Sequence, residues 1–240
     1  MHIINHFQST FTVANNCIRN DLISKTIPSL VSVDENRMLL WVPHREEIKD
    51  ALFSLNEDVA PGPDGFGGHF YQIYWDIIGV DVFQSVQEFF TSDVLANNVN
   101  SNLIVLIPKV PGPRVMGDYR PIALANFQFK IITKILTDKL AIITTRIIYV
   151  EQRGFIRDRK IYKCVILESE AINLLDKPQY GGNIAIKVDI AKSFDTLDWN
   201  FLLVVLREFG FDEMFVTWIL LILQSGRLSV KVGKTQEGGG

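Results

Sequence analysis

The fold of this chain is indicated most clearly by the stretch "IAIKVDIAKSFDTLDWNFL", which runs from Ile184 to Leu202. Its first part is a short apolar run that ends in an acid, Asp189, before any helical pattern begins. A run this short and this apolar is typical of a buried strand. Because an unpaired buried carboxylate costs free energy, we expect Asp189 either to bond loop amides at the strand end or to face a cleft and hold a divalent cation such as Mg²⁺.

A second acid, Asp195, follows six residues later and precedes a helical pattern. Asp198 lies three residues beyond it, and this spacing is typical of a capping box at a helix N-terminus. The segment "DTLDWNFLLVVLREFG" therefore predicts a helix over 195–210. Gly210 is expected to end it, since glycine is common just after the last helical turn.

Helices and strands alternate along the rest of the chain. Apolar periodicity predicts helices over 44–56, 69–78, 81–90, 126–147, 164–177 and 215–223, with Gly79 separating the second from the third. Extended segments are predicted over 101–110 and 227–232, with a second one after the turn that starts at Pro111. Strands interleaved with helices indicate an α+β domain, or an α/β-type mix.

Composition limits the classes of protein. The chain has 240 residues, of which 48% are hydrophobic, so it is long and apolar enough to bury a sizeable core. Its cysteines, Cys17 and Cys164, are far apart, which argues against a zinc site or a disulfide framework and fits a reducing compartment. The longest apolar stretch, Phe215–Leu223, is about half of the ~20 residues that a membrane span needs. We expect no membrane association and no secretory signal.

Charge is distributed unevenly. The net charge is −3, yet the segment from Ile107 to Lys163 holds 12 Lys or Arg and 4 Asp or Glu. The remainder of the chain holds 12 Lys or Arg and 23 Asp or Glu. Two interpretations stay open at this point. The cations either lie on solvated helix faces or form a basic surface for phosphates.

Four sequence blocks resemble the reverse transcriptases, most of all those of the non-LTR, LINE-type retrotransposons of plants. In chain order they are "APGPDGF" (60–66), "LIPKVPGPRVMGDYRPIALANFQFKIITKIL" (106–136), "EQRGFIRDRKI" (151–161) and "KVDIAKSFDTLDW" (187–199). The resemblance covers about residues 44–232. It implies the fingers and part of the palm of a right-hand polymerase. Residues 1–43 would be an unassigned N-terminal extension, 44–100 a helical segment, 101–182 the fingers and 183–240 a partial palm.

The resemblance also implies roles for single residues. Asp189 and the Ile190 carbonyl would bind Mg²⁺, and Phe194 would lie under the sugar of the incoming nucleotide. Lys109 and Arg120 would grip its triphosphate, since both donate charge-assisted hydrogen bonds to phosphate oxygens. Template contacts would come from cations in the third block and just after it: Arg153, Arg157, Arg159, Lys160 and Lys163. From the residues alone, Phe194 is as well explained as a core aromatic, and the cations as solvated surface charges.

Two departures from the family pattern affect the expected activity. The family's catalytic site needs a pair of adjacent aspartates, and this chain contains no Asp-Asp pair. Asp158 also stands where the family has a glycine, which places a negative charge next to the expected template. We therefore expect a reverse transcriptase truncated after its first palm motif, with little or no polymerase activity on its own.

Partners and alternatives follow from the same resemblance. The complete enzyme would use an RNA template, a DNA primer and deoxynucleoside triphosphates, in the nucleus or cytoplasm. The alternative is a non-catalytic nucleic-acid-binding remnant. A phosphohydrolase with Asp189 as nucleophile is disfavoured, because Ala191 occupies the position of the second acid that it would need.

Overall fold

A computed structural model describes residues 21–175, 177, 180–186, 188 and 196–230. The helices are α2 (Leu22–Thr26), α3 (Val33–Leu40), α4 (Arg45–Ser54), α5 (Gly68–Ile73), α6 (Trp75–Ser92), α7 (Phe127–Ile147), α8 (Tyr162–Leu175), α10 (Trp199–Glu208) and α11 (Glu213–Gln224). The strands are β1 (Ser101–Pro108), β2 (Tyr119–Ala125) and β3 (Arg227–Val230), and a 3₁₀ turn, η1, spans Met116–Asp118. The chain therefore has the mixed helix and strand content that the sequence predicts.

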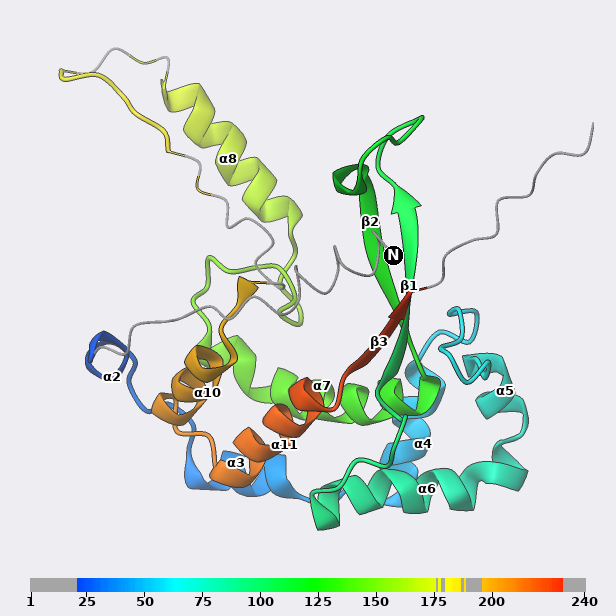
Figure 1. The fold of residues 1–240 in the computed structure, drawn as a ribbon. Coiled ribbons are helices and arrows are strands. Elements are labelled where there is room, and N and C mark those ends of the chain that lie inside the picture. Colours follow the sequence, from blue (N-terminus) through cyan, green and yellow to red (C-terminus); the bar gives the residue numbers. More distant parts are fainter. Residues whose placement is uncertain (1–20, 176, 178–179, 187, 189–195, 231–240) are drawn as a thin grey trace, which may run out of the picture.

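The described strands form one sheet in the order β2-β1-β3. β1 pairs with β2 in antiparallel register, so that Asn102 faces Ala125 and Ile107 faces Arg120. β3 pairs with the first half of β1 in parallel. The free half of the β1–β2 hairpin therefore extends away from the helices, as Figure 1 shows.

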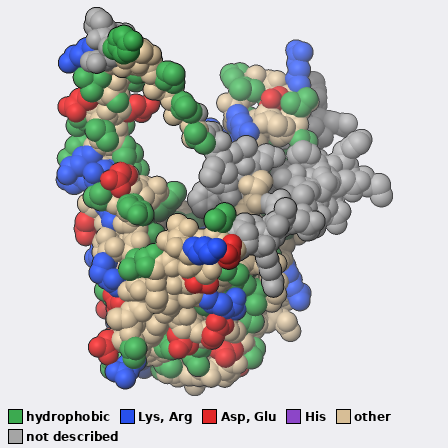
Figure 2. Space-filling view, turned by 90° about the vertical axis from the view of Figure 1, so that its left-hand side faces the viewer, with side chains coloured by type: hydrophobic (Ala, Val, Ile, Leu, Met, Phe, Trp, Pro, Cys, Tyr) green, Lys and Arg blue, Asp and Glu red, His purple; other side chains and the backbone are tan. Residues whose placement is uncertain are grey.

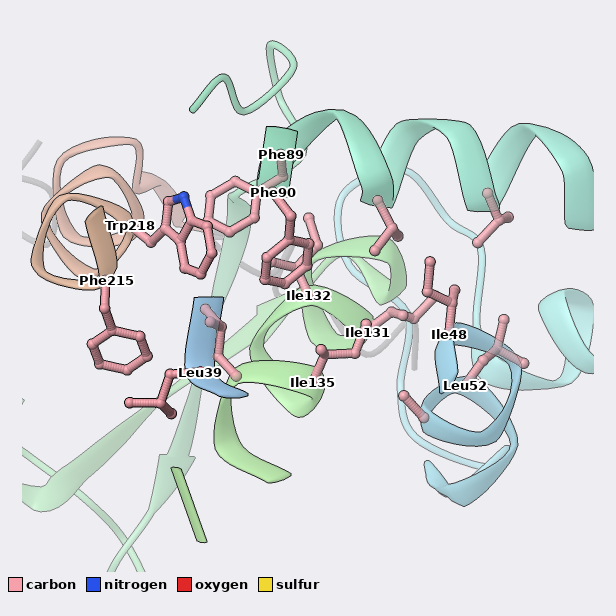
Figure 3. Packing of buried hydrophobic residues seen from close by; sticks show 14 of the residues in the cluster. Leu39, Ile48, Leu52, Phe89, Phe90, Ile131, Ile132, Ile135, Phe215 and Trp218 are labelled. Carbon is pink, nitrogen blue, oxygen red and sulfur yellow. The ribbon is translucent and has the colours of Figure 1, made fainter. Parts of the chain in front are cut away.

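Helix α7 runs through the middle of the hydrophobic core. Ile131, Ile132 and Ile135 on this helix are at most 1% exposed. Figure 3 shows them between Ile48 and Leu52 of α4 and the aromatic side chains of α6 and α11. The apolar stripe predicted for 126–147 is thus confirmed as the face that the other helices cover.

An aromatic cluster joins α6 to α11. The ring of Trp218 lies 5.1 Å from that of Phe90 and 6.1 Å from that of Phe89. A buried indole nitrogen needs a hydrogen-bond acceptor, and Trp218 donates to a carboxylate oxygen of Asp93 over 2.7 Å. Asp93 ends α6 in the left-handed conformation, with φ of 53°. The C-terminal turn of one helix therefore fixes the central aromatic side chain of the other.

The helix break predicted at Gly79 is wrong. α6 continues through Gly79, and the break lies at Tyr74, between α5 and α6. A Cβ atom at Gly79 would lie 3.0 Å from the indole ring of Trp75, one turn earlier on the same helix. The glycine therefore leaves room for a buried tryptophan side chain and does not end the helix.

Part of the N-terminal segment contacts the turn between α10 and α11. The amide nitrogens of Leu30 and Val31 both donate to the carbonyl of Phe209 over 2.9 Å. The side chain of Asn36 donates to the carbonyl of Gly210 over 2.7 Å. Gly210 has φ of 91°, as expected for a residue that ends a helix, and a Cβ atom there would meet the hydroxyl of Ser29 at 2.5 Å. These contacts tie the segment before α4 to the last helices.

The buried strand predicted over 184–189 is wrong for the residues that the structure describes. Ile184, Ile186 and Val188 have no regular secondary structure and are 86%, 82% and 82% exposed. A strand needs a neighbour for its backbone hydrogen bonds, and no described strand pairs with this run. Helix α8, which precedes it, buries no side chain, and Figure 2 shows hydrophobic side chains exposed on the part of the molecule that projects from the body.

The helix predicted from Asp195 also begins later than expected. α10 starts at Trp199, and Asp198 caps it by accepting a hydrogen bond from the amide of Phe201 over 2.7 Å. Asp195 itself lies outside the described residues. Within the part of the chain that the structure describes, no helix is long and apolar enough to cross a membrane.

Candidate nucleic-acid interface

Lys109 and Arg120 lie at the free end of the β1–β2 hairpin. The amide of Lys109 continues the ladder beyond Pro108 by donating to the carbonyl of Asp118 over 2.7 Å. Arg120 follows two residues after Asp118 and faces Ile107 across the ladder. Both cationic side chains are exposed. The pairing of the two strands thus brings together two cations that are eleven residues apart in the sequence.

The turn that closes the hairpin is held by Asp118. Its carboxylate accepts hydrogen bonds from the amides of Arg114, over 2.8 Å, and Val115, over 3.1 Å. These bonds, together with the positive charge of Lys109, lower the pKa of Asp118 below its usual 3.8. The Lys109 amine donates to the carbonyl of Gly117 over 2.8 Å. The lysine side chain is therefore held against the turn.

The glycine-rich loop over 60–68 packs against the N-terminus of α7. Asn126, which is 6% exposed, accepts from the amide of Asp64 over 3.2 Å and donates to the carbonyl of Asn98 over 2.9 Å. A Cβ atom at Gly62 would lie 2.4 Å from the amide nitrogen of Asn126. The sequence marks this loop by its glycines, but it does not identify Asn126 as the residue that anchors it.

Lys130 lies one turn into α7, beside the same loop. Its amine donates to the carbonyl of Ala60 over 3.3 Å. Partial burial lowers the pKa of Lys130, and the nearby charge of Asp64 opposes this shift. The sequence interpretation did not single out Lys130, because its spacing suggested only the solvated face of a helix.

The guanidinium of Arg159 is hydrogen-bonded to backbone carbonyls at and just after the C-terminal end of α7. It donates to the carbonyls of Thr145 over 2.7 Å, Ile148 over 2.9 Å and Gln152 over 2.8 Å, and also to that of Tyr149. The last carbonyls of a helix have no partner within the helix, and a cation is favourable there. Arg159 was predicted to contact the template, whereas in this structure its donors hold the loop that follows α7.

The other cations of this loop are at least partly accessible to solvent. Arg157 and Lys160 are exposed, and Arg153 is partly exposed. The Lys160 amine lies 6.0 Å from the centre of the Tyr162 ring. Asp158, between them, has φ of 63°, the left-handed conformation that a glycine adopts without strain. The loop thus keeps the backbone shape of a glycine while it carries a carboxylate.

The two basic regions lie at opposite ends of α7. The hairpin joins its N-terminus through Asn126, and the loop with Arg157 follows its C-terminus (Figure 1). A helix of 21 residues is about 31 Å long at ~1.5 Å per residue. The structure therefore does not gather the predicted cations into one compact pocket. The hairpin cations and the cations of the loop after α7 are therefore two separate groups, and each needs its own ligand or its own part of a long one.

Asp189, Ile190 and Phe194, for which a metal or sugar contact was predicted, lie outside the described residues. Among the residues that are described, no group of three or more His, Cys, Asp or Glu is close enough to hold a metal ion. The roles of these three residues stay predictions.

The chain is similar to known proteins over more than half of its length. A family profile described as "Reverse transcriptase (RNA-dependent DNA polymerase)" matches residues 107–239, which include the turn of the hairpin, β2 and the loop that follows α7. A Xenopus laevis protein described as "Transposon TX1 uncharacterized 149 kDa protein" is 26% identical over 188 residues, which are 78% of this chain and 14% of that protein. A yeast protein described as "Putative COX1/OXI3 intron 2 protein" is 30% identical over 134 residues, 55% of this chain and 15% of that protein.

The chain matches only a small part of each of these relatives. It spans about one seventh of the length of the curated relatives that it matches. They come from a frog and a yeast, so they give no support to the specific likeness to plant elements that the sequence suggested.

Proposed function

Because this chain belongs to the reverse transcriptase family, we propose that it forms the fingers and the first part of the palm of an RNA-directed DNA polymerase from a non-LTR retrotransposon. In this proposal residues 44–100 are the helical segment before the fingers, 101–182 the fingers and 183–240 the start of the palm. The order of the sequence blocks and the transposon relative support it. The RNA template, the DNA primer and the nucleotide are partners of the complete enzyme.

The observation that carries the proposal is the position of Lys109 and Arg120. An exposed hairpin that projects from the helical body presents two cations near each other, at its free end. Charge-assisted hydrogen bonds from ammonium and guanidinium groups are the usual way in which proteins hold a triphosphate. We assign both residues to the incoming nucleotide.

Asp189 and the Ile190 carbonyl are the proposed metal ligands. Both donors are oxygens, which suits Mg²⁺, an ion usually bound through one or two carboxylates plus substrate phosphates. When bound, the metal would neutralise charge on the phosphoryl oxygens. Phe194, five residues after Asp189, is proposed to lie under the nucleotide sugar and to exclude a 2′-hydroxyl. All three residues are outside the described part of the chain.

For the template we retain Arg153, Arg157 and Lys160 on the loop that follows α7. Contacts of this kind position a nucleic acid without reading its sequence. We assign Arg159 a positioning role instead, because the backbone carbonyls of α7 and the loop already accept from its donors.

The test is nucleotide binding to the whole chain in the presence of Mg²⁺, measured by the fluorescence of a labelled deoxynucleoside triphosphate. Lys109→Ala and Arg120→Ala are each expected to weaken binding about tenfold, as expected for loss of about 1.4 kcal/mol from a charge-assisted bond. Arg114→Ala is the matched control, since Arg114 is exposed on the same hairpin turn. Equal binding by all three variants and the parent chain would refute the assignment.

A second measurement separates an enzyme from a nucleic-acid-binding remnant. The chain holds no Asp-Asp pair, so we expect little or no primer extension from these 240 residues alone. Mg²⁺-dependent extension that Asp189→Ala abolishes would contradict this expectation. RNA binding that falls steeply with salt and is indifferent to Asp189→Ala would favour the remnant.

A further inference from the structure

One long part of the chain carries no positive side chain. Between residues 50 and 108 there are eight Asp or Glu and no Lys or Arg. This part includes α5 and α6; in Figure 1, α6 lies on the side of the helical body away from the hairpin, and α5 lies at the edge of the body next to α6. It is therefore chemically distinct from the basic segment that the proposed function uses.

The outer side of α5 and the first half of α6 is apolar. Ile77 is 75% exposed, Ile73 58%, Val80 49% and Tyr74 47%. On α6, Ile77 and Val80 are three residues apart, and residues at this spacing lie on one face of a helix. The opposite face holds Trp75 and other side chains that are buried in the core. We call the exposed residues Ile73, Tyr74, Ile77 and Val80 the α5–α6 surface.

Neighbouring aromatic side chains make this surface rigid at one end. The ring of Phe70 lies 5.2 Å from that of Tyr74 and 4.5 Å from that of Phe66. Phe70 packs in turn against the core cluster. A partner would therefore bind a preformed surface, which reduces the entropic cost of binding.

Carboxylates flank the apolar residues. Asp76 and Asp81 are exposed and lie on either side of the line that joins Ile77 and Val80 on α6. Further along the helix the outward positions become polar, with Gln84 and Glu88 exposed. The α5–α6 surface is thus a short apolar strip bordered by negative charge.

We propose that the α5–α6 surface is a docking site for a protein segment that has apolar residues on one face and Lys or Arg beside them. An amphipathic helix of this kind buries its apolar side on a matching strip, and its cations pair with the bordering acids. The proposal does not depend on polymerase activity, since it uses none of the residues assigned to the nucleotide or the template.

The charge pattern disfavours two other occupants. A nucleic acid would bring phosphates against Asp76 and Asp81. A second copy of the chain docked through the same surface by twofold symmetry would bring the same acids against each other. Like charges placed opposite one another weaken association.

The test measures binding of a fluorescein-labelled synthetic peptide to the whole chain by fluorescence anisotropy. The peptide has about 18 residues, long enough to form a helix, with Leu on one face and Lys on its borders. The matched control peptide has Glu in place of Lys. We expect the Lys peptide to bind with a micromolar dissociation constant, and the Glu peptide to bind at least about tenfold more weakly.

Variants locate the binding site. Ile77→Ser combined with Val80→Ser should weaken binding at least about tenfold, and Asp76→Asn combined with Asp81→Asn should weaken it and reduce its dependence on salt. Gln84→Ala, at the next outward position of α6, should leave it unchanged. The substituted residues are exposed, so unchanged circular dichroism should confirm that each variant is folded.

Three results would overturn the proposal. Equal binding of the Lys and Glu peptides would show only apolar adhesion. Concentration-dependent dimerisation that Ile77→Ser abolishes would assign the surface to a second copy of the chain. Displacement of the Lys peptide by an RNA oligonucleotide, combined with loss of RNA binding in Ile77→Ser, would assign it to nucleic acid.

Discussion

The guanidinium of Arg159 donates a hydrogen bond to the carbonyl of Thr145 over 2.7 Å, across fourteen residues of sequence. The same side chain reaches the carbonyls of Ile148 and Gln152. It therefore closes the C-terminal end of α7 and fixes the path of the loop that carries the other cations. The sequence predicts a template contact for Arg159, and the structure shows its guanidinium bonded to backbone carbonyls of the chain itself.

Arg159→Ala should destabilise the chain. Loss of the charged donors leaves carbonyls of α7 and the loop without partners, and we expect a cost of about 2 kcal/mol. For a chain of this size that corresponds to a fall in Tm of roughly 4–8 °C, measured by circular dichroism.

Arg157→Ala is the control for this substitution, since Arg157 is exposed on the same loop. It should leave Tm nearly unchanged and weaken RNA binding. If Arg159→Ala instead kept the parent Tm and lost RNA affinity, Arg159 would be a direct template contact.

Substitutions at Asp158 should show how much stability its left-handed backbone conformation costs. Its φ of 63° costs a residue with a Cβ atom roughly 1–2 kcal/mol, although Asp tolerates it better than most. We expect Asp158→Gly to be about 1 kcal/mol more stable than Asp158→Ala in urea unfolding.

The same position tests the effect of charge on RNA binding. Asp158→Gly and Asp158→Asn both remove a carboxylate beside Arg157 and Arg159, so both should bind RNA more tightly at low salt than the parent chain. If only Asp158→Gly gained affinity, backbone shape and not charge would be the cause.

The sequence correctly predicted helices and strands whose apolar face is covered by other described parts of the chain. The stripe of Ile131, Ile132 and Ile135 predicted α7, and the apolar run before Pro108 predicted β1, because each pattern reports a face that its neighbours cover. It failed at Gly79, since a glycine that makes room for Trp75 looks in sequence like one that ends a helix. It also failed at Ile184 and Ile186, since an apolar run forms a strand only when another strand pairs with it.

The candidate site could be predicted only in part, because some of its contacts join residues that are far apart in the sequence. The positions of Lys109 and Arg120 followed from family motifs, and the strand register shows why they are close. The role of Asn126 depends on hydrogen bonds to residues 28 and 62 positions away in the sequence, which no local pattern encodes.

Gly62→Ala should detach the glycine-rich loop from α7. The added Cβ atom would lie 2.4 Å from both the amide nitrogen and the side-chain oxygen of Asn126, so the backbone must move, at a cost of about 2 kcal/mol or more. Limited proteolysis should then cleave within 60–68. Gly117→Ala is the control, because a Cβ atom there has no neighbour within 4 Å, and it should leave both stability and cleavage unchanged.

Glu35 should make the stability of the chain depend on pH under acidic conditions. Hydrogen bonds from the Ser32 amide and from Arg146 lower the pKa of Glu35 from 4.5 to about 2. A folded-state pKa below the unfolded value contributes stability that is fully present above pH 4.5 and is lost as the pH falls towards 2. The difference in Tm between the parent chain and Glu35→Gln should therefore be constant above pH 5 or so and shrink below that. Asp34→Asn, on the same helical turn, serves as the comparison. A Tm difference for Glu35→Gln that stayed constant down to about pH 2 would show that the ionised carboxylate contributes nothing to folding.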